Sequence, residues 1–102
     1  MTPIMRDSYN FHQPATILVV DDTPDNLMLM AELLKDKYRV KLANNGEKAL
    51  RILEGDPLPD LILLDIMMPG LSGLQVAERL QQDVRTRHIP IIFLTAMAAV
   101  ES

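Results

Sequence analysis

The most constraining feature of the sequence is an apolar run, residues 61–64 (Leu-Ile-Leu-Leu), that ends at one acidic residue, Asp65. No polar residue interrupts the run, and Pro69-Gly70 follows closely as a turn signal. Runs of this kind are typical of strands buried on both faces, as in a parallel sheet covered by helices. Asp65 is therefore expected at the carboxyl end of a strand, the edge where α/β sheets bind ligands.

Two further apolar runs have the same form. Residues 17–20 lead directly into Asp21 and Asp22, and residues 91–94 lead into Thr95. Three buried parallel strands are thus predicted to carry three carboxylates and a hydroxyl to one rim. For Asp22 alone, helix capping and metal binding are both open, and Thr95 alone is an ordinary strand residue.

Helical patterns separate the apolar runs. The predicted order is βαβαβαβ, with strands at about 16–21, 38–43, 61–65 and 91–95, and helices from Thr23 onward, at about 47–54 and at about 72–82. This order indicates right-handed crossovers and one parallel sheet with helices on both faces. The second strand alternates apolar and polar residues, which favours an edge position. Ser72 and Gln75 have the spacing of a capping box.

The first predicted helix has Thr23 as its N-cap and Pro24 as its first residue. A core-facing stripe is predicted at helical spacing by Leu27, Met30, Ala31 and Leu34. Three more apolar residues widen this stripe: Met28, Leu29 and Leu33. Core packing is the interpretation we favour for them, and an adaptable, methionine-rich binding surface is the alternative.

Composition narrows the possible classes. The sequence has 102 residues, which suits one modest domain, and its lack of cysteine excludes a disulfide framework or a thiolate site within it. The net charge of −4 gives no electrostatic case for nucleic-acid binding by this segment. No membrane-spanning run or signal peptide is recognisable, so a cytoplasmic location is expected. Residues 1–15 are expected to be a mobile extension of a domain at residues 16–102.

Three carboxylates on one rim repel one another, by roughly 4 kcal/mol per pair at about 4 Å and an intermediate dielectric constant. A hard divalent cation relieves this repulsion. An all-oxygen site without His or Cys favours Mg²⁺, with Mn²⁺ as the alternative. A carboxylate beside such an ion can attack phosphorus and form an acyl phosphate.

Three motifs resemble the receiver domain of two-component response regulators: residues 17–22 (ILVVDD), 61–70 (LILLDIMMPG) and 90–96 (PIIFLTA). The resemblance covers about residues 16–102 and implies an α/β, flavodoxin-like, doubly wound parallel sheet of order 2-1-3-4-5. It implies that the domain is a signalling phosphoacceptor, which takes a phosphoryl group from a histidine kinase or phosphotransfer protein. The domain then switches conformation to control an output domain or partner.

The resemblance also implies roles for individual residues. Asp65 is the implied phosphoacceptor. Asp22 is implied to bind Mg²⁺ directly, Asp21 directly or through water, and Met67 through its backbone carbonyl. Thr95 is the implied switch hydroxyl that contacts the phosphoryl group.

The family also has a fifth strand that ends in a lysine, followed by a last helix, and both are expected beyond Ser102. We therefore expect a receiver domain of sheet order 2-1-3-4 that is incomplete at its C-terminus and compromised in phosphotransfer. The outer edge of its fourth strand is expected to be unpaired, which predicts self-association through that strand.

Two other functions are open from the sequence. A Mg²⁺-dependent phosphohydrolase with Asp65 as nucleophile generally has a second Asp two positions later, where this chain has Met67, so a turnover enzyme is not predicted. The third hypothesis is a binding-only module or a fragment without function. The complete acidic set argues against natural loss of phosphorylation, whereas the missing strand favours the fragment.

Overall fold

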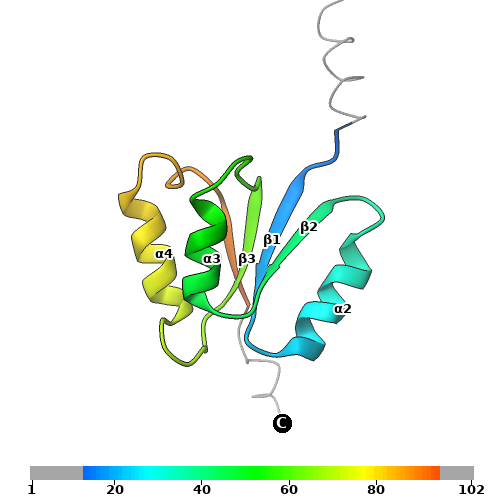
Figure 1. Ribbon diagram of the computed structural model, residues 1–102, viewed down its shortest axis with the longest axis horizontal. Helices are drawn as coiled ribbons and strands as arrows, with labels where there is room; N and C mark the ends of the chain where they lie inside the picture. Colours follow the sequence, from blue (N-terminus) through cyan, green and yellow to red (C-terminus); the bar gives the residue numbers. More distant parts are fainter. Residues whose placement is uncertain (1–12, 95–102) are drawn as a thin grey trace, which may run out of the picture.

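The computed structural model describes residues 13–94. Four parallel strands form one sheet in the order β2-β1-β3-β4 (Figure 1). The strands are β1 (Thr16–Val20), β2 (Arg39–Ala43), β3 (Leu61–Asp65) and β4 (Ile91–Leu94). The register places Val20 of β1 beside Ala43 of β2 and Leu64 of β3. The predicted α/β class, the parallel sheet and the order 2-1-3-4 are confirmed.

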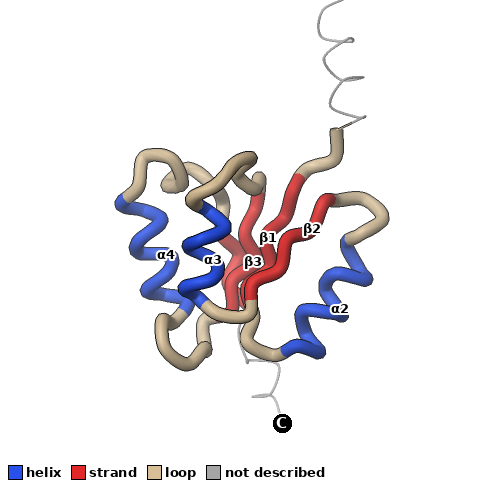
Figure 2. Tube along the Cα trace, viewed as in Figure 1, coloured by secondary structure: helices blue, strands red, loops and turns tan. Residues whose placement is uncertain are grey.

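Three helices cover the two faces of the sheet (Figure 2). They are α2 (Pro24–Leu34), α3 (Gly46–Leu53) and α4 (Gly73–Gln82). Alternate residues of β1 belong to opposite cores: Val19 packs with Leu27 of α2, and Leu18 lies in the core beneath α3 and α4. The sheet is therefore doubly wound, with a separate hydrophobic core on each face.

The helix starts follow the capping chemistry of the sequence, with one difference. The capping box of α4 is confirmed, because Ser72 and Gln75 each accept the other's backbone N–H through a side-chain oxygen. Asn45 caps α3 by accepting a backbone N–H at 2.7 Å. Thr23 occupies the N-cap position of α2, but its side chain makes no capping hydrogen bond. The backbone N–H of Thr23 instead donates to Asp21.

The predicted core packing of Met28, Leu29 and Leu33 on α2 is wrong. These side chains are 66%, 57% and 68% exposed, whereas Leu27 is buried and Leu34 is partly buried. A helix that lies on one sheet buries a single stripe of its surface, and other apolar residues already fill that stripe. The surplus apolar residues of α2 therefore face solvent.

The two outer strands are less covered than the central pair. Ile92 and Phe93 of β4 are 52% and 38% exposed, so the prediction that this strand is buried on both faces is wrong. Within residues 13–94, β4 pairs only with β3, so one edge and part of each face lack cover.

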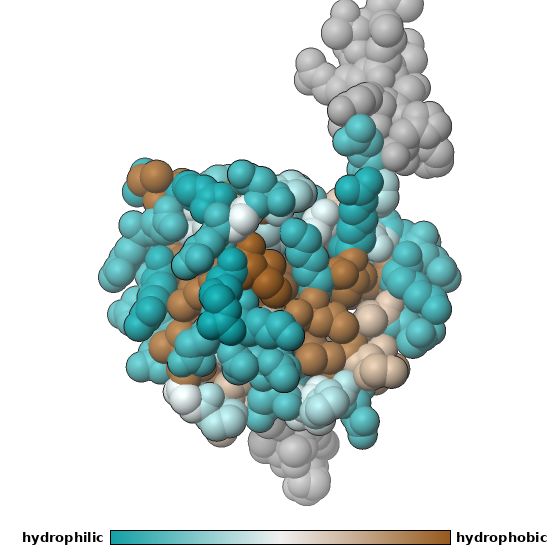
Figure 3. Space-filling view, viewed as in Figure 1, coloured by the Kyte–Doolittle hydropathy of each residue, from teal (hydrophilic) through white to brown (hydrophobic). Residues whose placement is uncertain are grey.

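The edge position predicted for β2 is confirmed, and hydrophobic surface is visible between α2 and α3 over that side of the sheet (Figure 3).

No helix in the described part of the chain is both long enough and apolar enough to span a membrane. Most of the predicted N-terminal extension, residues 1–12, lies outside the described residues, and so does Thr95. The roles predicted for those positions therefore stay predictions.

Candidate functional site

Two neighbouring strands end at adjacent carboxylates. Val20, the last residue of β1, pairs with Leu64, which is followed by Asp65 at the end of β3. Asp21 and Asp22 follow β1 directly. The three acids offer carboxylate oxygens that lie within 4.8 Å of one another. The structure thus brings together the three acids that the sequence singled out, which we call the acidic rim.

The acidic rim opens into a hollow of about 200 Å³. The hollow is lined by Asp21, Asp22, Thr23, Asn26, Asp65, Met67 and Leu94. Sequence reasoning did not find Asn26, because an amide in the first turn of a helix is an ordinary surface residue. One signal in the sequence could have found it: Asn26 follows the two acids by only a few residues. A residue in the first turn of the helix therefore stays close to the end of the strand.

Asp65 lies in a setting that disfavours its negative charge. Only 9% of the residue is exposed, and its Oδ1 accepts the backbone N–H of Met67 at 3.0 Å. Burial raises the pKa of Asp65, and the charges of Asp21 and Asp22 raise it further, whereas the hydrogen bond from Met67 lowers it in part. A proton or a cation at this point therefore relieves an electrostatic cost.

Asp21 is the most firmly held of the three acids. It is 5% exposed, its Oδ1 accepts the N–H of Thr23 at 2.9 Å, and its Oδ2 accepts Nδ2 of Asn26 at 3.3 Å. Its own N–H donates to the carbonyl of Ala43 in β2. Asp22 is more exposed than Asp21 or Asp65. The side chain that bonds the start of α2 is thus that of Asp21, and Asp22 lines the hollow beside it.

The backbone after Asp65 is fixed by close packing against α4. Gly73, the first residue of α4, donates its N–H to the carbonyl of Ile66 at 3.1 Å. A Cβ at Gly73 would collide with the backbone carbonyl of Asp65 and come within 2.8 Å of the Ile66 Cα. Only glycine lets the helix approach this closely. The start of α4 therefore holds the strand end that carries Asp65.

The donor set of the acidic rim fits a hard divalent cation. Carboxylate oxygens converge from three residues, and neither His nor Cys lines the hollow. Mg²⁺ and Mn²⁺ prefer such oxygen ligands. Met67 borders the hollow and directs its N–H to Asp65. The use of its carbonyl as a ligand stays a prediction.

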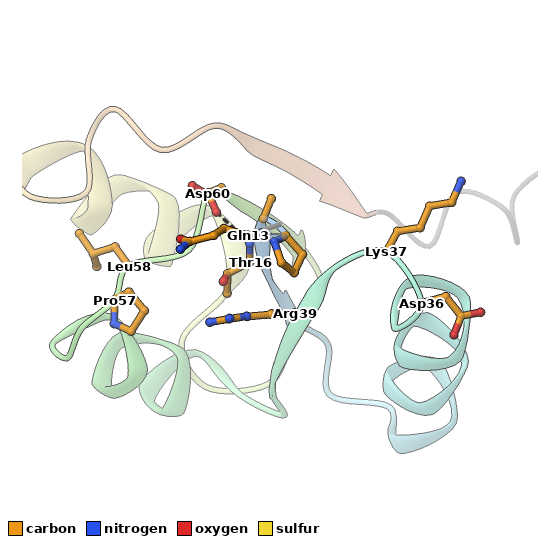
Figure 4. A pocket seen from close by; sticks show the side chains of 10 residues that line it. Gln13, Thr16, Asp36, Lys37, Arg39, Pro57, Leu58 and Asp60 are labelled. Carbon is orange, nitrogen blue, oxygen red and sulfur yellow. Dashed lines mark hydrogen bonds between the residues drawn. The ribbon is translucent and has the colours of Figure 1, made fainter. Parts of the chain in front are cut away.

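A larger hollow, of about 1010 Å³, lies at the opposite edge of the sheet, where the strands begin (Figure 4). Arg39 extends across it, and Lys37 points away from it. Asp60 is already engaged, because its Oδ2 accepts the N–H of Thr16 at 2.8 Å. Charges of both signs are mixed here and no titratable cluster converges. Size alone therefore does not identify the functional site.

Residues 17–102 match the family described as "Response regulator receiver domain". The chain belongs to this family. A solved receiver domain, the N-terminal domain of a response regulator receiver protein from Methanoculleus marisnigri JR1, is 41% identical with a TM-score of 0.73. The match covers 85% of this chain and 75% of that one. The Mn(2+)-bound form of response regulator Rcp1 is 31% identical with a TM-score of 0.72, over 80% of this receiver domain and 66% of Rcp1.

A curated relative of this receiver domain is named "Probable cyclic di-GMP phosphodiesterase", from Vibrio cholerae serotype O1. The two sequences are 48% identical over 86 residues, which are 84% of this chain but 19% of the relative. The receiver domain thus spans about a fifth of that protein. The family predicted from the three sequence motifs is confirmed, and receiver domains are signalling modules.

Proposed function

We propose that this receiver domain is the phosphoacceptor module of a two-component phosphorelay and that Asp65 takes the phosphoryl group. The observation that carries the proposal is the setting of Asp65: a nearly buried carboxylate at a strand end, beside two further acids and open to a small hollow. Met67 holds Oδ1 of Asp65, whereas no described residue donates a hydrogen bond to Oδ2. Oδ2 is therefore the proposed attacking atom.

In the proposed step, Oδ2 of Asp65 forms a bond to phosphorus while the bond between phosphorus and the donor nitrogen breaks. The donor is the phosphohistidine of a histidine kinase or phosphotransfer protein. Its imidazole leaves with the electron pair of the broken bond and takes a proton from water. The product on this chain is an acyl phosphate at Asp65. The fixed backbone at Ile66 and Gly73 keeps the carboxylate in position for the approach.

Asp21, Asp22 and Asp65 are the proposed side-chain ligands of Mg²⁺, together with the backbone carbonyl of Met67. When bound, Mg²⁺ supplies positive charge against the acids and the phosphoryl oxygens. Two observations support a divalent cation here: the convergence of carboxylate oxygens and the similarity to a response regulator in its Mn(2+)-bound form.

We further propose that phosphorylation shifts a conformational equilibrium that an output domain or partner reads. The phosphoryl group adds about −1.5 to −2 charges at Asp65. The hydroxyl of Thr95 is the proposed contact that responds to it. We place the module in the cytoplasm and assign it no nucleic-acid or membrane contact of its own.

Turnover of a free phosphoester is the competing function, and Met67 argues against it. A thioether supplies neither the acid nor the base that a hydrolase needs two positions after its nucleophile. The Vibrio cholerae relative is named for a phosphodiesterase activity, but that protein is about five times as long as the region that matches this chain. The name therefore does not assign that activity to the matched region. This segment therefore carries the phosphoryl group without turning over a substrate.

The test is the intact mass of the chain after incubation with Mg²⁺ and acetyl phosphate. We expect the gain of one phosphoryl group, lost in Asp65→Asn and lost when a chelator removes Mg²⁺. Asp36→Asn is the matched control, because Asp36 is exposed in the turn after α2 and lines the hollow where the strands begin, not the hollow of the acidic rim. A folded chain that gains no phosphoryl group, or gains it equally in Asp65→Asn, contradicts the proposal.

A further inference from the structure

We propose that Asn26 is a positioning residue of the acidic rim, which holds Asp21 in the orientation that a divalent cation requires. The inference rests on the proposed function, since it concerns the ion of that site. Asp21 is nearly buried, and each of its carboxylate oxygens accepts one hydrogen bond. One bond comes from the backbone at Thr23, and the other comes from the side chain of Asn26.

The two donors restrain Asp21 in different ways. The backbone N–H of Thr23, two residues after Asp21, donates only to Oδ1 of Asp21. The last torsion of an aspartate is broad, so a single bond leaves the carboxylate free to turn. Nδ2 of Asn26 holds the second oxygen, Oδ2. It does so from the first turn of α2, which the buried Leu27 fixes on the sheet.

A neutral amide suits this position because the rim already carries three acids. Asn donates a hydrogen bond without adding charge. A Lys or Arg in its place would neutralise Asp21 and compete with a cation, and an Asp would add to the repulsion. Asn26 also lines the same hollow as Asp65, so the carboxylate that it holds faces the space between the acids.

The expected effect of losing Asn26 follows from the geometry. Hydrogen-bond partners of metal-binding side chains typically change metal affinity by about 10- to 100-fold. The bond from Asn26 to Asp21 is long, at 3.3 Å, and Asn26 is exposed. We therefore expect the lower end of that range, a loss of about tenfold in Mg²⁺ affinity for Asn26→Ala.

The experiment is a Mg²⁺ titration of the full chain, followed by backbone amide NMR signals around the rim. Asn26→Ala and Asn26→Leu both remove the donor, and Leu also keeps the side-chain volume. Asn44→Ala is the matched control, because Asn44 is an exposed Asn after a neighbouring strand and does not line the hollow. We expect about tenfold weaker binding in both Asn26 variants and a change under twofold in the control. Thermal unfolding without Mg²⁺ verifies that each variant is folded.

A second arm separates positioning from a general structural role. If Asn26 acts through Asp21, Asn26→Ala adds no further loss of affinity in an Asp21→Ala background. Equal losses in both backgrounds overturn the inference, and so does an Asn26→Ala variant that binds Mg²⁺ within twofold of the wild type. If the wild-type chain binds no Mg²⁺, the Mg²⁺ site of the proposed function is wrong, and the role inferred for Asn26 is wrong as well. Normal wild-type binding with no effect of Asn26 overturns this inference alone.

Discussion

Asp65 combines burial, two acidic neighbours and one stabilising N–H, and the balance of these raises its pKa. When the pKa of a carboxyl is higher in the folded chain than in the unfolded chain, its contribution to folding stability is greatest at a pH where the group is protonated in both. This contribution is lost as pH rises through the folded-state pKa. Above its folded-state pKa, the charge that Asp65 carries in the ion-free chain therefore opposes folding.

We predict that Asp65→Asn raises the Tm of the ion-free chain at pH 7, because the amide removes this charge and still accepts the N–H of Met67. The gain should shrink as pH falls below the folded-state pKa toward the ordinary Asp value of 3.8. Mg²⁺ should also shrink the gain at pH 7, because the ion stabilises the wild type more than the variant. Circular dichroism melts across pH, with chelator or Mg²⁺, measure both effects. A variant that is less stable at pH 7 without Mg²⁺ contradicts this account.

The three acids were predictable because the Asp21-Asp22 pair and Asp65 directly follow apolar runs, and strand ends of a parallel sheet share an edge. Asn26 was not predictable in the same way. Its role depends on where the first turn of α2 sits beside Asp21, and a sequence pattern does not give that position.

At the scale of elements, the contact between α4 and the end of β3 depends on Gly73. We predict that Gly73→Ala destabilises the fold by about 1–3 kcal/mol, because its Cβ would meet the backbone of Asp65 and Ile66. Gly55→Ala is the matched control. A Cβ at Gly55 meets nothing closer than the Ile52 carbonyl, at 3.7 Å, so we expect a neutral change or a gain of up to about 1 kcal/mol. Urea unfolding of both variants measures the difference, and equal stabilities would refute the packing argument.

Two leucines of α2 provide a second comparison within one element. Leu27→Ala should cost about 2–5 kcal/mol, because Leu27 is buried between α2 and the sheet. Leu33→Ala should stay within about 0.5 kcal/mol of the wild type, because Leu33 is 68% exposed. Denaturant midpoints report both values. A large cost at Leu33 would mean that a contact outside residues 13–94 covers it.

The elements themselves were largely predictable, and their burial was not. The capping box at Ser72 and Gln75 follows from local chemistry and was confirmed. The helical spacing correctly placed Leu34 on the core-facing stripe of α2, but the apolar residues of this helix exceed what one face can bury, and the sequence pattern did not show that Leu29 and Leu33 face solvent. Packing against β1 and β3 decides that choice.

At the scale of the whole molecule, alternation of strands and helices predicts a parallel sheet without its strand order. Several orders satisfy the same right-handed crossovers. The order 2-1-3-4 came from the resemblance to receiver domains, and the structure confirms it. This order makes β1 and β3 neighbours, and it therefore brings Asp21 and Asp65 together.

We also propose that this chain associates with itself through β4, whose Ile92 and Phe93 are exposed. Sedimentation velocity at high micromolar concentration should show a species larger than a monomer. Ile92→Lys should reduce that species, because charge on an outer strand opposes pairing between sheet edges. Val84→Lys, at a 68% exposed residue outside the sheet, is the control. A monodisperse wild-type monomer contradicts the proposal.

In the proposed function, Asp65 carries the phosphoryl group, and neither Asp21 nor Asp22 does. The most direct measurement is to treat the phosphorylated chain with borohydride, which reduces an acyl phosphate to an alcohol, and to locate the resulting homoserine by peptide mass spectrometry. We expect homoserine at position 65 alone. Homoserine at position 21 or 22, or phosphorylated protein with no homoserine at position 65, would contradict it.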